Sequence, residues 1–186
     1  MTEAEWVEIM RERIASVAFP RARGVKVKSG LRIPYGFEIT SYNTQPESKA
    51  IAFETDLAII ETDDQGRWKP RVIIEAKIRS VTTHDAITYS QKASAHKSVH
   101  PYLRYGIMLG ERQHLPLPGR LYRHGAHFDF MISFVATTPT RNELLKFAEV
   151  LRAEVEASRT LEKMIYKSRS PTRDRYTLVH RKLRAE

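Results

Sequence analysis

The 186-residue sequence lacks cysteine, long apolar runs and a glycine-rich phosphate loop. Without cysteine the chain can form neither disulfide bonds nor thiolate metal sites, which fits the cytoplasmic location that we expect. No apolar run approaches the roughly 18–20 residues that span a bilayer, and the N-terminal segment is too charged for a signal peptide. The absent phosphate loop and the absent G-x-S-x-G pattern argue against nucleotide-driven chemistry and a serine nucleophile.

Acidic residues are in the minority, with 22 Asp and Glu against 31 Lys and Arg, for a net charge of +9. This surplus favours a polyanionic partner such as nucleic acid, although it can also serve solubility alone. Two segments concentrate the cations without comparable acid: residues 92–104 and the tail from about 167 to 186. The predicted phosphate contacts in them are Lys92, Lys97, Arg104, Arg169, Arg173, Arg175, Arg181 and Lys182.

Hydrophobic periodicity predicts a single α/β domain over residues 1–186 with a mixed sheet. The expected elements are a helix over 1–19, one or two strands over 24–42 broken at Gly30 and Pro34, strands over 49–61 and 71–78, a helix from Thr82 or Thr83 to before Pro101, a strand over 104–109, a loop over 111–125, a strand over 127–137, an amphipathic helix over 142–167 and a short strand over 176–180.

The stretch FETDLAIIETDDQGRWKPRVIIEAKI, residues 53–78, places charges inside two apolar strands. If the hairpin is centred between Gln65 and Gly66, Asp56 pairs directly with Glu75, with their Cβ atoms roughly 4.5–5.5 Å apart. Lys77 lies two residues after Glu75 and therefore shares its face of the strand. The pattern predicts that two carboxylates and one ammonium converge on one patch of the sheet.

Two close carboxylates repel each other unless a cation lies between them, and a hard divalent cation such as Mg²⁺ prefers carboxylate oxygens. A neighbouring lysine can orient a metal-bound water or neutralise a phosphate. The simpler interpretation is a cross-strand salt bridge on a solvated edge. The apolar runs LAII and VII beside the acids favour the metal site, because charges in doubly buried strands are costly without a function.

Asp56, eighteen residues, and then Glu75-Ala76-Lys77 on a strand resemble the PD-(D/E)XK nuclease superfamily, with Thr55 where the motif often has proline. The resemblance covers about residues 1–110 and implies a restriction-endonuclease-like core, a central mixed sheet flanked by helices. It implies that Asp56 and Glu75 bind Mg²⁺, for which Mn²⁺ can substitute, with the Ala76 carbonyl as a further ligand. Lys77 would act on the attacking water.

Members of this superfamily often add a glutamate from the first helix. Four glutamates are available there: Glu3, Glu5, Glu8 and Glu12. Only Glu3 lies near the apolar stripe of the helix, so the sequence singles out none of them. Glu38 is another candidate acid.

On the helix after Lys77, a Gln or Lys supports the site in some branches of the superfamily. A core tyrosine with exposed neighbours is the simpler interpretation of Tyr89, Gln91 and Lys92. The histidines lack a zinc spacing with a third ligand: His84, His96 and His100.

The sequence therefore predicts a Mg²⁺-dependent endonuclease acting on double-stranded DNA, resembling type II restriction enzymes and working as a homodimer. The helix from Asn142 is a candidate dimer contact, and the loop over 111–125 is a candidate for reading the target. A resolvase, repair or transposition nuclease of the same superfamily remains an alternative. So do a non-catalytic DNA-binding module with this fold and a structural protein whose charges merely pair.

Overall fold

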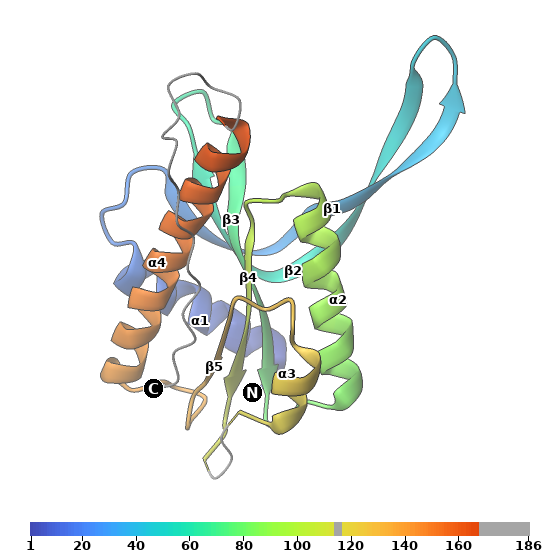
Figure 1. The fold of residues 1–186 in the computed structure, drawn as a ribbon. Coiled ribbons are helices and arrows are strands. Elements are labelled where there is room, and N and C mark those ends of the chain that lie inside the picture. Colours follow the sequence, from blue (N-terminus) through green and yellow to red (C-terminus); the bar gives the residue numbers. More distant parts are fainter. Residues whose placement is uncertain (114–116, 168–186) are drawn as a thin grey trace.

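The computed structural model describes residues 1–113 and 117–167 and contains a five-stranded mixed sheet with helices on both faces (Figure 1). In chain order the elements are α1 (Glu3–Ala18), β1 (Val25–Tyr42), β2 (Pro46–Thr62), β3 (Trp68–Ile78), α2 (Thr83–Val99), β4 (Arg104–Gly110), α3 (Gly119–His124), β5 (Phe130–Ser133) and α4 (Arg141–Tyr166). The strands lie side by side in chain order, with β1 to β3 antiparallel and β3 to β5 parallel. The predicted α/β class with a mixed sheet is confirmed.

Each of the three long helices begins at a threonine whose side chain accepts a hydrogen bond from the backbone three residues later. In all three, an acid at that later position accepts a hydrogen bond from the threonine amide: Thr2 with Glu5, Thr82 with Asp85 and Thr140 with Glu143. This capping box satisfies amide groups that the first helical turn leaves without intrahelical partners. The helix starts are therefore encoded locally. The sequence prediction, made from hydrophobic periodicity and the cap at Thr82 or Thr83, placed them within two residues.

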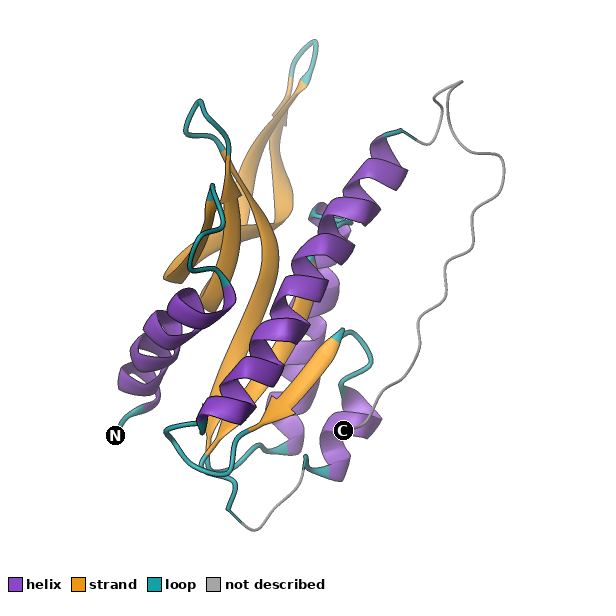
Figure 2. Cartoon of the chain, turned by 90° about the vertical axis from the view of Figure 1, so that its left-hand side faces the viewer, coloured by secondary structure: helices purple, strands orange, loops and turns teal. Residues whose placement is uncertain are grey.

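Two apolar layers hold the sheet between the helices. The α1 and α4 side contains Trp6, Leu57, Ile74 and Phe147, and Figure 2 looks onto this side, with α4 crossing in front of the sheet. The α2 and α3 side contains the alternate residues of the same strands, such as Ile73, which precedes Ile74 on β3. Alternate side chains of β3 thus enter different layers, as strand geometry requires. In the described part of the chain, no helix has both the length and the apolarity to cross a bilayer.

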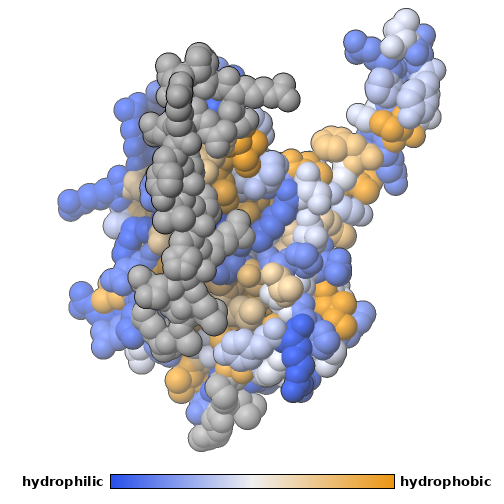
Figure 3. All heavy atoms as spheres, viewed as in Figure 1, coloured by the Kyte–Doolittle hydropathy of each residue, from blue (hydrophilic) through white to orange (hydrophobic). Residues whose placement is uncertain are grey.

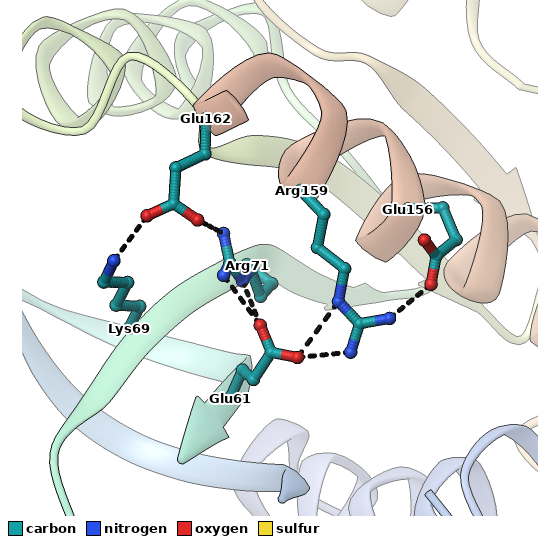
Figure 4. A network of polar contacts seen from close by, with 6 residues as sticks. All are labelled: Glu61, Lys69, Arg71, Glu156, Arg159 and Glu162. Carbon is teal, nitrogen blue, oxygen red and sulfur yellow. Dashed lines mark hydrogen bonds and ion pairs between the residues drawn. The ribbon is translucent and has the colours of Figure 1, made fainter. Parts of the chain in front are cut away.

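The apolar stripe of α4 is buried inside the chain, where Leu151 and Val155 pack in the core. A polar network also fixes the end of this helix to β2 and β3 (Figure 4). Arg71 pairs with Glu61 at 2.7 Å and with Glu162 at 2.6 Å. Most of this stripe is therefore used for folding, while Leu145 is 41 % exposed, and α4 as a dimer contact stays a prediction.

Several elements differ from the sequence prediction. β1 is one continuous strand, because Gly30 adopts a φ of 62° that bends the chain and a register shift absorbs one residue between Pro34 and Gly36. The strand expected over 127–137 has only four residues, and the loop expected over 111–125 contains α3. The strand expected over 176–180 lies outside the described residues.

Beyond the body of the molecule, β1 and β2 continue as a two-stranded arm that projects into solvent (Figure 1). We use the term arm for residues 37–50, all of which are exposed. The pairing continues to the turn, where Tyr42 faces Pro46. The sequence predicted that the second of these strands begins only at Lys49, with a turn just before it. The length of this hairpin was therefore not anticipated.

Candidate active site

The two predicted acids lie on adjacent antiparallel strands in the expected register. Leu57 pairs with Ile74, as predicted. Nearer the turn the pairing is centred on Gln65 instead of between Gln65 and Gly66, and a bulge between Ile59 and Ile60 shifts the ladder by one residue into the predicted register. Asp56 and Glu75 occupy the next positions along β2 and β3. The Asp56 Oδ2 atom accepts a hydrogen bond from the Ala76 amide at 2.7 Å, which holds this carboxylate against β3 beside Glu75.

Glu75 and Lys77 point toward α2. Ala76, between them, is buried in the opposite layer against α1 and α4. On their own side, Glu75 contacts Lys92 of α2, and the Lys77 Nζ atom lies 5.6 Å from the ring centre of Tyr89 on the same helix. The predicted convergence of the E-x-K pair on one face of the strand is therefore present.

Glu75 is the closed end of the site, with a side chain only 1 % exposed. Tyr105 donates its hydroxyl hydrogen to Oε1 of Glu75 at 2.5 Å, and the Lys92 Nζ atom lies 3.2 and 3.4 Å from the two carboxylate oxygens. Burial raises the pKa of Glu75 to about 7; Lys92 opposes this shift, and the neighbouring charge of Asp56 adds to it. A buried acid near a second acid is the electrostatic setting in which a cation binds.

Lys77 is the open end of the site. Its Nζ atom lies 3.1 Å from Oε1 of Glu3, and the two side chains are 23 % and 37 % exposed, so solvent reaches the site here. Burial alone would lower the pKa of Lys77, but hydrogen bonds to Tyr89 and Glu3 outweigh it and raise the pKa above its ordinary value. Lys77 is therefore a cation at neutral pH, held between α1 and α2.

The structure distinguishes Glu3 from the other glutamates of α1. Glu5 caps its own helix at Thr2, and the next two glutamates along α1 both pair with Arg11. Glu8 also hydrogen-bonds Ser29 of β1, but among these four glutamates only Glu3, in the first turn, has an ion pair with Lys77. Its nearness to the apolar stripe was the one signal in the sequence, and it was too weak to choose Glu3 alone.

Tyr89 and Lys92 lie against Lys77 and Glu75, and the simpler interpretation from sequence holds for only part of this set. Tyr89 is half-buried and packs against the core on the α2 side, as that interpretation expected, but Lys92 turns its ammonium inward to Glu75 instead of being exposed. Gln91, between them, is exposed. The spacing of three residues that puts Tyr89 and Lys92 on one helix face was visible in the sequence. The direction of that face was not, because it depends on how α2 packs on the sheet.

Glu38, the predicted additional acid, is not brought to the site. It lies in the arm, where it pairs across the ladder with Lys49. Lys49 precedes Asp56 by seven residues on β2, about 23 Å at roughly 3.3 Å per residue. Side chains do alternate along β1 at Glu38, as predicted, but this part of the strand extends away from the body of the molecule and from the site.

All three predicted phosphate contacts within residues 92–104 have partners within the chain, and the partner of Lys92 is Glu75. Lys97 pairs with Asp129 at 2.8 Å, and Arg104 pairs with Asp129 at 2.9 Å and with Glu154 at 2.5 Å. The Arg104 side chain is only 12 % exposed, so it ties β4 to α4. The five remaining candidates lie in the tail, outside the described residues: Arg169, Arg173, Arg175, Arg181 and Lys182.

The donor set suits a hydrated Mg²⁺ ion better than a dehydrated metal centre. Within residues 1–113 and 117–167, no group of three or more His, Cys, Asp or Glu could by itself hold a metal ion. Mg²⁺, however, needs only one or two carboxylates and keeps several waters. Asp56 and Glu75 provide those carboxylates, and the Ala76 carbonyl is a further oxygen on the same stretch of β3. Binding there would relieve the repulsion between the two acids.

The site thus combines two carboxylates that can share a cation with two ammonium groups that can face an anion. No family model matches the chain, and no curated protein matches it. Function must therefore be inferred from the chemistry of the site.

Replacing Glu75 by Gln should raise the melting temperature at pH 8 much more than at pH 5. The folded state holds the Glu75 proton more tightly than the unfolded chain, since the pKa rises from 4.5 to about 7. The contribution of the protonated group to stability is complete below pH 4.5 and is lost as pH rises through 7. At about 1.4 kcal/mol per pKa unit the loss is about 3 kcal/mol, or roughly 6–12 °C. The Glu75→Gln variant has no carboxyl group to deprotonate, so its stability does not fall in this way as pH rises.

Thermal unfolding in EDTA at both pH values measures the effect. The matched control is Glu149→Gln, an exposed position on α4. Equal melting differences for Glu75→Gln at the two pH values would contradict the raised pKa.

Proposed function

We propose that the protein is a Mg²⁺-dependent endonuclease that hydrolyses phosphodiester bonds of double-stranded DNA. The observation that carries the proposal is the meeting of Asp56, Glu75 and Lys77 on one sheet face, with Glu75 buried and its pKa raised. The element order also supports it, since the acid lies on the second strand, the E-x-K on the third, and a helix and a parallel strand follow. We place the fold with the PD-(D/E)XK nucleases and the activity with type II restriction enzymes.

Each site residue has a role that its surroundings support. Asp56, Glu75 and the Ala76 carbonyl would hold Mg²⁺, which when bound would polarise the phosphate and make water a better nucleophile. Lys77 is protonated, so it is suited to orienting that water and neutralising charge on the phosphate rather than to accepting a proton. Glu3 and Tyr89 hold its ammonium in place, which keeps the group oriented before substrate arrives.

The charge of the chain supports nucleic acid as the substrate. A net charge of +9 attracts a polyanion and accelerates its association. Lys92 adds a second ammonium within the site, where it can face either Glu75 or a bound phosphate. DNA therefore fits both the long-range field of the chain and the local charge at Lys77.

One observation favours a second candidate, a DNA-binding module without catalytic activity. Both Glu75 and Lys77 already have ion-pair partners, Lys92 and Glu3. A module that kept the fold for binding alone would show such internal neutralisation. The complete set of two acids and a lysine makes the nuclease the better proposal, because a non-catalytic relative has no need to retain all three.

Cleavage of unmethylated DNA separates these candidates. Circular plasmid and long linear DNA are incubated with the full chain in Mg²⁺, Mn²⁺, Ca²⁺ or EDTA, and each mixture is analysed on a denaturing gel and by gel shift. We expect cutting in Mg²⁺ and Mn²⁺, binding with little cutting in Ca²⁺, and no cutting in EDTA. Discrete fragments would support a restriction enzyme, and a smear would indicate a nonspecific or repair nuclease. Binding without cutting in Mg²⁺ and Mn²⁺ would establish the non-catalytic module.

A further inference from the structure

The arm exposes apolar side chains that nothing in the described chain covers. Phe37 is 57 % exposed, Ile39 47 % and Tyr42 79 %. Figure 3 shows the arm standing clear of the body, with apolar groups among polar ones. An isolated two-stranded hairpin is marginally stable in water, and exposed apolar groups that cluster mark interaction sites. The arm therefore has the properties of an element that acts on another molecule.

The base of the arm is fixed, in contrast to its exposed outer part. Tyr35 stacks on Phe53 with ring centres 3.7 Å apart, and both rings meet the buried His96 edge-on. The His96 Nε2 atom lies 3.1 Å from the carbonyl oxygen of Ile33, and His100, the residue that follows the end of α2, makes the same contact with Pro34. The arm thus leaves the body in a set direction, which lowers the entropic cost of docking.

The two faces of the arm differ in chemistry. Phe37 faces Ala50 across the ladder, and Ile39 faces Ser48. Because side chains alternate along a strand, these four residues share one face, whereas the pair of Glu38 and Lys49 lies on the other. The register shift between Ile39 and Ser41 adds one residue and so returns Tyr42, which pairs with Pro46, to the face of Phe37. The arm therefore presents one face that can be buried against a partner and one that can stay in water.

The charge of the arm indicates what the partner is. Residues 37–50 hold two glutamates and one lysine and no arginine, a net charge of −1, while the chain as a whole carries +9. A net-negative arm is repelled by phosphates, so a DNA groove is a poor fit. The basic body of a second copy offers the opposite charge.

We propose that the arm is a dimerisation element that docks through Phe37, Ile39 and Tyr42 on the body of a second copy of this chain. A two-fold arrangement would let each arm grip the other body, so one self-complementary contact is made twice. The arm thus takes the place of α4, most of whose apolar stripe is used in the core. The proposal does not depend on the nuclease activity.

Mass measurement of two arm variants tests the proposal. One is Phe37→Ser/Ile39→Thr/Tyr42→Ser. The other replaces residues 38–49 by Asn-Gly, a two-residue turn that can join the paired positions Phe37 and Ala50. Tyr122→Ser is the matched control, an exposed aromatic on α3 that is 66 % exposed. Circular dichroism checks that every variant is folded.

Light scattering after gel filtration should give the parent and the control twice the chain mass of 21.5 kDa. Both arm variants should have the single mass, with a dimer Kd raised about 100-fold or more. Glu38→Lys/Glu47→Lys should slow association and so weaken the dimer in low salt, since it reverses the long-range charge of the arm without changing the apolar face that docks. A parent that is monomeric at about 100 µM, or arm variants that stay dimeric, would overturn the proposal. An unchanged mass with weaker DNA binding in the gel shift would instead assign the arm to nucleic acid.

Discussion

Replacing Asp56 by Asn should abolish DNA cleavage while leaving the fold and DNA binding intact. Asn keeps a side-chain oxygen that can accept the hydrogen bond from the Ala76 amide, now 2.7 Å from Asp56, so β2 and β3 stay joined. It removes the negative charge that Mg²⁺ requires, and we expect a loss of cleavage rate of about 10³-fold or more. DNA binding should persist or tighten, because one source of repulsion toward phosphate is gone. Single-turnover cleavage and gel-shift titration of the same preparation measure both effects.

The matched control is Asp64→Asn in the turn between β2 and β3, where the side chain is 88 % exposed. It removes the same charge from the same hairpin but away from the site, so cleavage should be unchanged. Mg²⁺ should raise the melting temperature of the control and of the parent, but that of Asp56→Asn much less. Cleavage by Asp56→Asn at the parental rate would place the active site elsewhere.

The sequence was sufficient to bring Glu75 and Lys77 to one face of β3, because the period of two is a local rule. The register of Asp56 opposite Glu75 was reached less directly. The turn is centred on Gln65 rather than between Gln65 and Gly66, and the bulge between Ile59 and Ile60 shifts the ladder by the one residue that restores the predicted register. The cap at Thr82 made the start of α2 readable because a cap is also a local signal, and hydrophobic periodicity located the starts of α1 and α4.

The partners of the site were not readable, because they come from tertiary packing. Glu3 reaches Lys77 from α1, Lys92 reaches Glu75 from α2, and Tyr105 reaches Glu75 from β4. Each contact depends on how a helix or strand lies on the sheet, which no local spacing fixes. These partners neutralise the charges that the strands bury, and so explain how the sheet accommodates them.

The arm was missed for a different physical reason. Gly30 and Pro34 are ordinary signals for a strand end, and the chain uses them instead to bend one long strand. Gly30 supplies a positive φ, and the register shift after Pro34 absorbs an extra residue. Glu38 was misplaced with it, since its distance from Asp56 depends on whether the strand continues.

Replacing Lys77 by Met should also abolish cleavage but should leave Mg²⁺ binding intact, and this contrast with Asp56→Asn separates the two roles. Met keeps an apolar stem that can pack beside Tyr89, and it removes the ammonium that now lies 3.1 Å from Glu3. We expect a loss of about 10²–10³ in cleavage rate, because a positioned charge is lost. The melting temperature should still rise with Mg²⁺, since Asp56 and Glu75 remain.

Glu3→Gln shows whether Glu3 acts through Lys77. If Glu3 only holds the ammonium in place, Glu3→Gln alone should slow cleavage, and the double variant Glu3→Gln/Lys77→Met should be no slower than Lys77→Met. Lys163→Met, an exposed cation on α4, is the control and should cut at the parental rate. A further loss in the double variant would show a second role for Glu3, independent of Lys77. A Lys77→Met protein that cuts normally would exclude Lys77 from catalysis, however close it lies to the two acids.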